Sequence, residues 1–212
     1  VAKKENSNLP IILFGHSMGS FVSQRYIELY GNGIDGVILS GTNGKPDRIT
    51  KLGILISKIE IMLKGRKAKS KLMDKLSFGD FNSNFKPTRT DYDWLCSVNE
   101  EVDKYIESPV CGFICSTSFY YDLIRGLWKI NKKENLNNIP KNLPIYIFAG
   151  DKDPVGKFGK GIVKLYDTYK SIGIYNLNYK LYSNGRHEML NENNKDEVIK
   201  DLLDWINNKI TV

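Results

Sequence analysis

One feature constrains the fold of this chain most: a short apolar run that is followed, after only five residues, by a helical pattern. Residues 9–14 are almost continuously apolar, which is typical of a strand buried on both faces of a parallel sheet. Residues 15–19 interrupt the run, and apolar residues then recur at helical spacing up to Gly31, where we expect the helix to end. The pattern predicts a strand joined directly to a helix.

The same alternation of strand and helix returns along the chain. Residues 34–39 and 143–149 are two further buried runs, and residues 177–181 alternate apolar with polar side chains as an edge strand does. Helical patterns cover residues 162–173 and 198–206. Strands that alternate with helices predict an α/β fold with a parallel sheet.

Residues 43–140 differ from the rest because their apolar residues follow helical periods only. Three helices are predicted, around residues 49–63, 98–106 and 119–128. No strand pattern interrupts them, so we expect a helical insertion between two strands of the sheet. The basic run at residues 64–71 is interpreted as a solvated helix end or loop.

Composition limits the class of protein more than it identifies one. The chain has 212 residues, 41% of them hydrophobic and 26% charged, which is enough to bury a core. Neither a membrane span nor a cleavable signal is expected, because the apolar runs are too short. The net charge of +7 is spread along the chain without an arginine cluster, so nucleic-acid binding is a distant alternative.

The cysteines and histidines argue against a metal centre. Cys96, Cys111 and Cys115 are odd in number and lack paired ligand spacing, and the chain has only two histidines. We interpret the cysteines as free thiols of a reducing compartment and predict a cytoplasmic protein. No metal, cofactor or nucleic acid is expected. Transient contact with a membrane surface through the basic run stays an open alternative.

The turn between the first strand and its helix carries a chemical motif. Gly15, His16, Ser17, Met18 and Gly19 form G-x-S-x-G, and this position in the fold is that of a nucleophile elbow. The two glycines are expected because strand and helix backbones approach closely there. The serine hydroxyl would stand at a helix N-terminus, which favours developing negative charge.

A serine hydroxyl needs a base, and a base needs a group to orient it. His16 lies inside the elbow, and we expect its side chain to point away from the reacting face, so His187 is the predicted base. Asp151 and Asp153 both follow the third buried run. We predict Asp153 as the acid and Asp151 as a turn former. The order Ser17, Asp153, His187 is that of α/β-hydrolases.

These loops resemble those of the monoacylglycerol lipase and lysophospholipase group of α/β-hydrolases, also called the serine aminopeptidase S33 group. Residues 11–20 resemble its elbow, residues 149–155 its acid loop and residues 185–188 its histidine loop. Residues 119–124 are similar to the end of its cap. The resemblance covers the whole chain, with the highest specificity at the three loops.

The resemblance implies both domain organisation and activity. Residues 1–42 and 141–212 would form the hydrolase core, and residues 43–140 a helical cap over the site. The implied reaction is cleavage of a lipid-type ester, a lysophospholipid or monoacylglycerol, through an acyl-enzyme with the Met18 N–H binding the oxyanion. A peptidase or amidase of the proline iminopeptidase type is the alternative within the same class of enzyme.

The chain departs from the group's pattern upstream of the elbow. Members of the group have several strands before it, and a His-Gly loop that supplies a second oxyanion amide. We therefore expect a carboxyl-terminal two-thirds of a hydrolase, with Val1 a cut. An elbow strand with a bare edge would invite self-association. A catalytically silent chain that acts as an assembly module is the second hypothesis.

Overall fold

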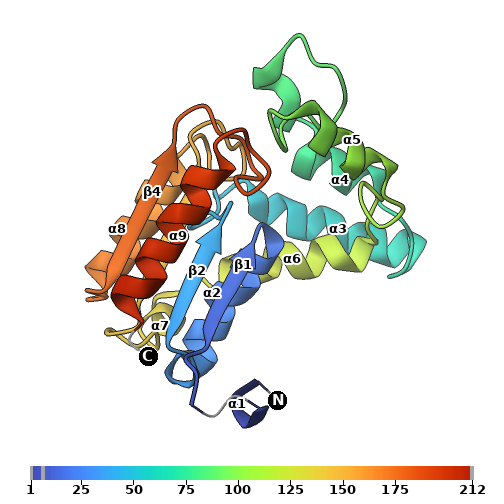
Figure 1. Cartoon of the computed structure of the whole chain (residues 1–212). Coiled ribbons are helices and arrows are strands. Elements are labelled where there is room, and N and C mark those ends of the chain that lie inside the picture. Colours follow the sequence, from blue (N-terminus) through green and yellow to red (C-terminus); the bar gives the residue numbers. More distant parts are fainter. Residues whose placement is uncertain (1, 6–7, 211–212) are drawn as a thin grey trace.

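The computed structural model describes residues 2–5 and 8–210, so Val1, the predicted cut, lies outside the described residues. Its centre is one parallel sheet whose strands lie side by side in chain order (Figure 1). The strands are β1 (Ile12–His16), β2 (Gly36–Ser40), β3 (Ile145–Gly150) and β4 (Leu177–Tyr182). The predicted α/β architecture is confirmed.

Helices cover both faces of this sheet. Figure 1 shows α9 on one face, with α2 and α8 on the other. The bounds of these three helices are α2 (Met18–Tyr30), α8 (Lys160–Ser171) and α9 (Lys195–Lys209). Two short helices, α1 (Ala2–Glu5) and η1 (Gly31–Gly33), lie before β1 and after α2 in the chain. Parallel strands need such crossover connections, because the chain must return to the same end of the sheet each time.

The side chains of β2 and β3 alternate between two hydrophobic cores, one on each face of the sheet. Val37 and Leu39 face α2 and α8, where they pack with buried residues such as Leu165. Ile38 and Phe148 face the other way and pack against α9. Successive side chains of a strand point to opposite faces, so near-continuous apolar strands fill both cores at once.

The segment between β2 and β3 is helical, as predicted. It consists of α3 (Thr50–Lys64), α4 (Lys71–Phe78), η2 (Phe81–Phe85), α5 (Asn99–Glu107), α6 (Thr117–Lys129) and α7 (Lys133–Leu136). Helices α3, α4 and α6 share a small core around Met73, Tyr120 and Ile124. The basic run is the exposed turn between α3 and α4. Among the described helices, none is both long and apolar enough to cross a membrane.

The first strand differs from its expectation in position and burial. β1 starts at Ile12 and includes Gly15 and His16, whereas the apolar run covers residues 9–14. Within the described sheet β1 pairs only with β2, and Phe14 is 42% exposed. β1 is therefore a partly exposed edge strand and not one buried on both faces. β4 forms the opposite edge, as its alternating pattern predicts.

Helix α2 presents an unexpected face to the sheet. The apolar stripe that marks this helix in the sequence, with Val22 and Leu29 among its members, is largely exposed. The buried side chains are instead Ser20, Ser23, Gln24, Ile27 and Glu28. Small serines suit this face because the helix starts directly from the strand and runs close to it. Periodicity thus predicts the helix correctly but not its orientation.

Glu28 is a buried acid on that face. Its side chain is 1% exposed, and its Oε2 accepts a hydrogen bond of 2.7 Å from Arg25. Burial raises the pKa of Glu28 to about 7, although the Arg25 charge and hydrogen bond act in the opposite direction. A carboxyl whose pKa rises on folding from about 4.5 contributes less stability as the pH climbs through that window.

We expect Glu28→Gln to stabilise the protein at pH 8 and to be close to neutral at pH 4. The pKa difference between about 4.5 and about 7 corresponds to up to about 3 kcal/mol once the acid is ionised. Urea unfolding at both pH values measures the difference. A variant that is equally destabilised at both would mean that the Arg25 pair outweighs the cost of burying the charge.

Candidate active site

The turn between β1 and α2 holds Ser17 in a strained backbone conformation. Its φ of 52° and ψ of −122° lie in a region that residues with a side chain rarely adopt. The Ser17 N–H donates to the Ser40 carbonyl at 2.9 Å, and the Ser17 carbonyl accepts from the Ser20 N–H at 2.9 Å. These bonds to β2 and to the first turn of α2 hold the serine at the end of the sheet.

The two elbow glycines have different reasons to be glycine. A Cβ added to Gly15 would collide with Ser23 Oγ and approach the Gly19 carbonyl oxygen to 2.6 Å. A Cβ added to Gly19 would meet nothing within 4 Å. The expectation that both positions need a small residue is therefore wrong for Gly19. The close approach of the two backbones falls on Gly15.

This difference gives a matched pair of variants. Gly15→Ala should cost about 1–3 kcal/mol of unfolding free energy, because a methyl group must displace backbone atoms. Gly19→Ala should be neutral or stabilising by up to about 1 kcal/mol, since alanine is the better helix former. Chemical denaturation of both variants checks this. Equal losses would show that the crowding at Gly15 does not control the elbow.

A buried acid and base lie at the carboxyl ends of β3 and β4. His187 Nδ1 is 3.0 Å from Asp153 Oδ2 and 3.1 Å from Oδ1, and the two side chains are 2% and 0% exposed. Asp153 Oδ1 also accepts the Val155 N–H at 2.8 Å. A carboxylate that accepts from Nδ1–H leaves Nε2 as the free acceptor of the ring. This is the tautomer that a general base requires.

Asp151, the other candidate acid, bonds to a turn and not to His187. Asp151 Oδ1 accepts the Asn184 N–H at 2.8 Å and so stabilises the turn after β4. The acid and histidine loops also touch through glycines, since a Cβ on Gly150 would collide with the Gly185 carbonyl. The structure places Asp153, and not Asp151, against His187.

His16 does not point away from the site as expected. Its ring centroid lies 4.8 Å from that of His187, and its Nδ1 is 3.0 Å from Ser40 Oγ. His16 is the last residue of β1, so its side chain lies beside the end of β2 and not out in solvent. Burial, with repulsion from His187, lowers the pKa of His16 to about 4, against the attraction of Asp153. His16 is therefore neutral near pH 7.

Ser17 and Met18 complete this end of the sheet. Among the described residues, no hydrogen bond joins the Ser17 hydroxyl to His187, and such bonds are often long until substrate binds. Met18 is the first residue of α2. Its N–H is one of the four amides that a helix leaves without an internal acceptor. The elbow thus offers a hydroxyl beside a free amide.

Three residues make contacts around His187 that the sequence analysis did not predict. Gly41 has a φ of 54°, and a Cβ there would lie 2.8 Å from His187 Cε1. The Trp94 ring centroid lies 5.1 Å from that of His187. The Arg186 guanidinium donates to the Cys96 carbonyl at 3.0 Å. The Ser40-Gly41 pair at the end of β2 is a signal for Gly41. Nothing local signals the contacts of Trp94 and Arg186, although Arg186 lies in the predicted histidine loop.

The cysteines take no part in this cluster and are all free thiols, as predicted. Burial raises the pKa of the Cys96 thiol to about 11, so it is a poor nucleophile. Across residues 2–5 and 8–210, no three His, Cys, Asp or Glu side chains are grouped so that they could hold a metal ion.

Solved structures with this fold are numerous. A carboxyl esterase from Bacillus coagulans, in complex with glycerol, is 28% identical with a TM-score of 0.90, and the match covers 99% of this chain and 68% of that one. A lipase in an open form is 24% identical with a TM-score of 0.85, covering 98% and 67%. A monoglyceride lipase from Saccharomyces cerevisiae is 19% identical with a TM-score of 0.74, covering 100% and 66%.

The last two similarities establish the fold alone, since they lie under 25% identity. The chain spans about two-thirds of the length of these structures. No curated protein sequence matches it. The family model described as serine aminopeptidase, S33, matches residues 1–194, which is most of the chain. The chain therefore belongs to the serine aminopeptidase S33 family of α/β-hydrolases.

Proposed function

We propose that the chain is a serine ester hydrolase in which Ser17 is the nucleophile, His187 the base and Asp153 the acid that orients it. The buried pair of His187 and Asp153, at the same end of the sheet as the strained Ser17, is the observation that carries the proposal. Similarity to a carboxyl esterase at 28% identity supports ester chemistry. The geometry of the three residues supports these roles.

The reaction proceeds in two halves. Ser17 Oγ attacks the ester carbonyl carbon while His187 Nε2 takes the hydroxyl proton, and the oxyanion forms beside the Met18 N–H. When the intermediate collapses, His187 returns the proton to the leaving alcohol and an acyl-Ser17 ester remains. Water then attacks this ester with His187 again as base, which frees the acid and restores Ser17. Asp153 holds the imidazole and stabilises its charged form.

The proposed substrate is a small lipid-type ester, such as a monoacylglycerol or a lysophospholipid. A groove of about 700 Å³ runs between α2 and α6 and includes Met18, the neighbour of the nucleophile. Its walls are mainly apolar, with Phe21, Val22, Phe119 and Leu123 among them. An acyl chain would bury its methylenes there at about 0.8 kcal/mol each. Residues 43–140 would act as the cap, above the core of residues 1–42 and 141–212.

A substrate panel separates this proposal from its alternatives. We expect p-nitrophenyl esters to turn over faster as the acyl chain lengthens from acetate to decanoate, and an aminoacyl amide to be inert. Faster cleavage of the amide would favour the proline iminopeptidase type. No turnover of any substrate would favour a silent chain. The cytoplasmic location stays a prediction that rests on the free thiols.

A second candidate property is self-association through β1. Among residues 2–5 and 8–210, β1 has a partner strand, β2, on one side only. The adjoining surface of α2 exposes Val22 and Tyr30 at 62% and 60%. Unpaired strand edges with apolar flanks are templates for pairing with another chain. We expect sedimentation to show dimers at micromolar concentration, and Phe14→Lys to weaken them. A monomer at all concentrations would contradict this proposal and leave the catalytic one standing.

A further inference from the structure

The imidazole of His187 packs against a ring from a distant part of the chain. The Trp94 indole belongs to the loop between η2 and α5, and its plane is tilted by 40° to that of His187. His16 packs against the same imidazole from the elbow. The base therefore touches two further rings in addition to its bond with Asp153. These contacts limit rotation of the ring about its bond to Cβ.

Trp94 is itself held by contacts with η2, and it lies at the end of a turn formed by residues 89–94. The backbone N–H of Trp94 donates to Asn82 Oδ1 at 2.8 Å, and the Asn82 side-chain amide donates to the Thr90 carbonyl at 2.7 Å. The Phe81 ring meets the indole edge-on at 4.8 Å. The side chain is thus held on η2 as well as by its own backbone.

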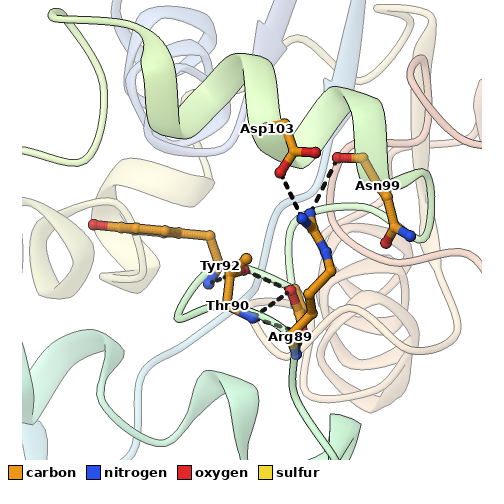
Figure 2. Close-up of polar contacts among 6 residues, drawn as sticks. Arg89, Thr90, Tyr92, Asn99 and Asp103 are labelled. Atoms are coloured by element: carbon orange, nitrogen blue, oxygen red, sulfur yellow. Dashed lines mark hydrogen bonds and ion pairs between the residues drawn. The ribbon is translucent and has the colours of Figure 1, made fainter.

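The start of the turn is equally well bonded (Figure 2). Figure 2 shows the Arg89 side chain between Asp103 and Asn99, both on α5. The guanidinium donates to Asp103 Oδ1 at 2.7 Å and to the Asn99 carbonyl at 3.2 Å. The buried Asp93 accepts the Arg89 N–H at 2.6 Å and the Thr90 hydroxyl at 2.5 Å. Two independent sets of hydrogen bonds therefore order residues 89–94.

The two segments that carry Trp94 and His187 are also bonded to each other. Arg186, which precedes His187, donates to the carbonyls of Asp93 and Cys96. The N–H of Glu188, which follows it, donates to the Leu95 carbonyl at 2.7 Å. The residues on both sides of the base are thereby joined to the residues around the indole.

A further acid strengthens this junction. Glu192 accepts the Arg186 N–H and the Ser97 N–H, both at 3.0 Å, and it also accepts the Ser97 hydroxyl. Its side chain is buried, and both oxygens are used. The carboxylate thus links Ser97, three residues after Trp94, to Arg186 in the histidine loop. Neither segment can shift without breaking several of these bonds.

We propose that Trp94 is a positioning residue for His187. Its indole keeps the imidazole in the orientation in which Nδ1 lies against Asp153 and Nε2 is left free to act as the base. The hydrogen bonds of Arg186 and Glu192 hold the two segments together and so keep the indole in contact with the imidazole. Because misplacement of a catalytic group by about 1 Å costs up to about 10²-fold in rate, a ring contact of this kind affects turnover more than substrate binding. The kinetic part of this inference rests on the proposed function.

Nuclear magnetic resonance tests the contact without reference to activity. The chain has two histidines, so its imidazole signals are few. We expect cross-peaks between the Trp94 indole protons and the His187 ring protons in the unaltered protein. Trp94→Leu should shift the His187 ring protons, because the ring current is lost, and Trp94→Phe should restore part of the shift. Trp128→Leu, on α6, is the matched control and should leave these signals unchanged.

Kinetics with an ester substrate test the consequence. Trp94→Leu should lower kcat by roughly tenfold to a hundredfold with little change in KM, and Trp94→Phe should recover most of the loss. Missing cross-peaks, or an unshifted His187 in Trp94→Leu, would overturn the proposal. A raised KM with unchanged kcat would also overturn it, because it would make Trp94 a substrate contact. If the unaltered chain cleaves no ester, the proposed function fails, while the resonance data still decide the contact.

Discussion

Replacing Ser17 with alanine is expected to lower kcat for ester hydrolysis by roughly 10⁶-fold, to the level set by binding and oxyanion contacts alone. The methyl side chain cannot form the acyl-enzyme, and the residual machinery has no group to replace it. Burst kinetics with p-nitrophenyl esters give the measurement. The fold should be unchanged, because the backbone bonds of Ser17 to Ser40 and Ser20 do not involve its hydroxyl.

Ser183→Ala is the control for this variant. Ser183 is exposed in the turn that leads to His187, so the same chemical change is made near the site but outside it. Its activity should equal that of the unaltered chain. Full esterase activity in Ser17→Ala would exclude the proposed nucleophile, whatever the control does.

The second large effect is expected for Asp153→Asn, which should lower kcat by about 10⁴-fold. An amide can donate to Nδ1, and the imidazole would then carry its proton on Nε2, where it cannot accept the serine proton. The volume is conserved, and the Val155 N–H can still donate to the amide oxygen. The loss should therefore appear in kcat with little effect on stability.

Asp151→Asn provides the matched comparison, two residues earlier in the same loop. Its Oδ1 accepts the Asn184 N–H, and an amide oxygen can accept the same bond. The ion pair with Lys152 Nζ at 3.9 Å is exposed and contributes little. We expect activity within about twofold of the unaltered chain, in line with a surface substitution. A larger loss in Asp151→Asn than in Asp153→Asn would reverse the assignment of the acid.

Most of the fold could be predicted because its signals are local. Buried strands read as apolar runs, helices as periodic ones, and the segment between β2 and β3 as helices without strands. The orientation of α2 could not be predicted. Its sheet-facing side uses small serines where the elbow brings the backbones close, so the apolar stripe lies on the outer side and contributes to the groove with α6.

The candidate site could likewise be predicted only in part. Ser17, Asp153 and His187 each follow a strand and carry a local pattern, so the sequence could indicate them, and the structure joins the last two directly. The contact of Trp94 with His187 depends on hydrogen bonds between residues far apart in the chain. The placement of His16 depends on the end of β1, two residues beyond the apolar run. Single-sequence patterns contain no information about such contacts.

Covalent labelling tests the central claim most directly. The chain is treated with a fluorophosphonate, and its intact mass and labelled peptide are measured by mass spectrometry. The proposed mechanism predicts one adduct, located on Ser17, that is lost in Ser17→Ala and formed much more slowly in Asp153→Asn. An adduct on another residue, or ester turnover by a chain whose Ser17 resists the reagent, would contradict it.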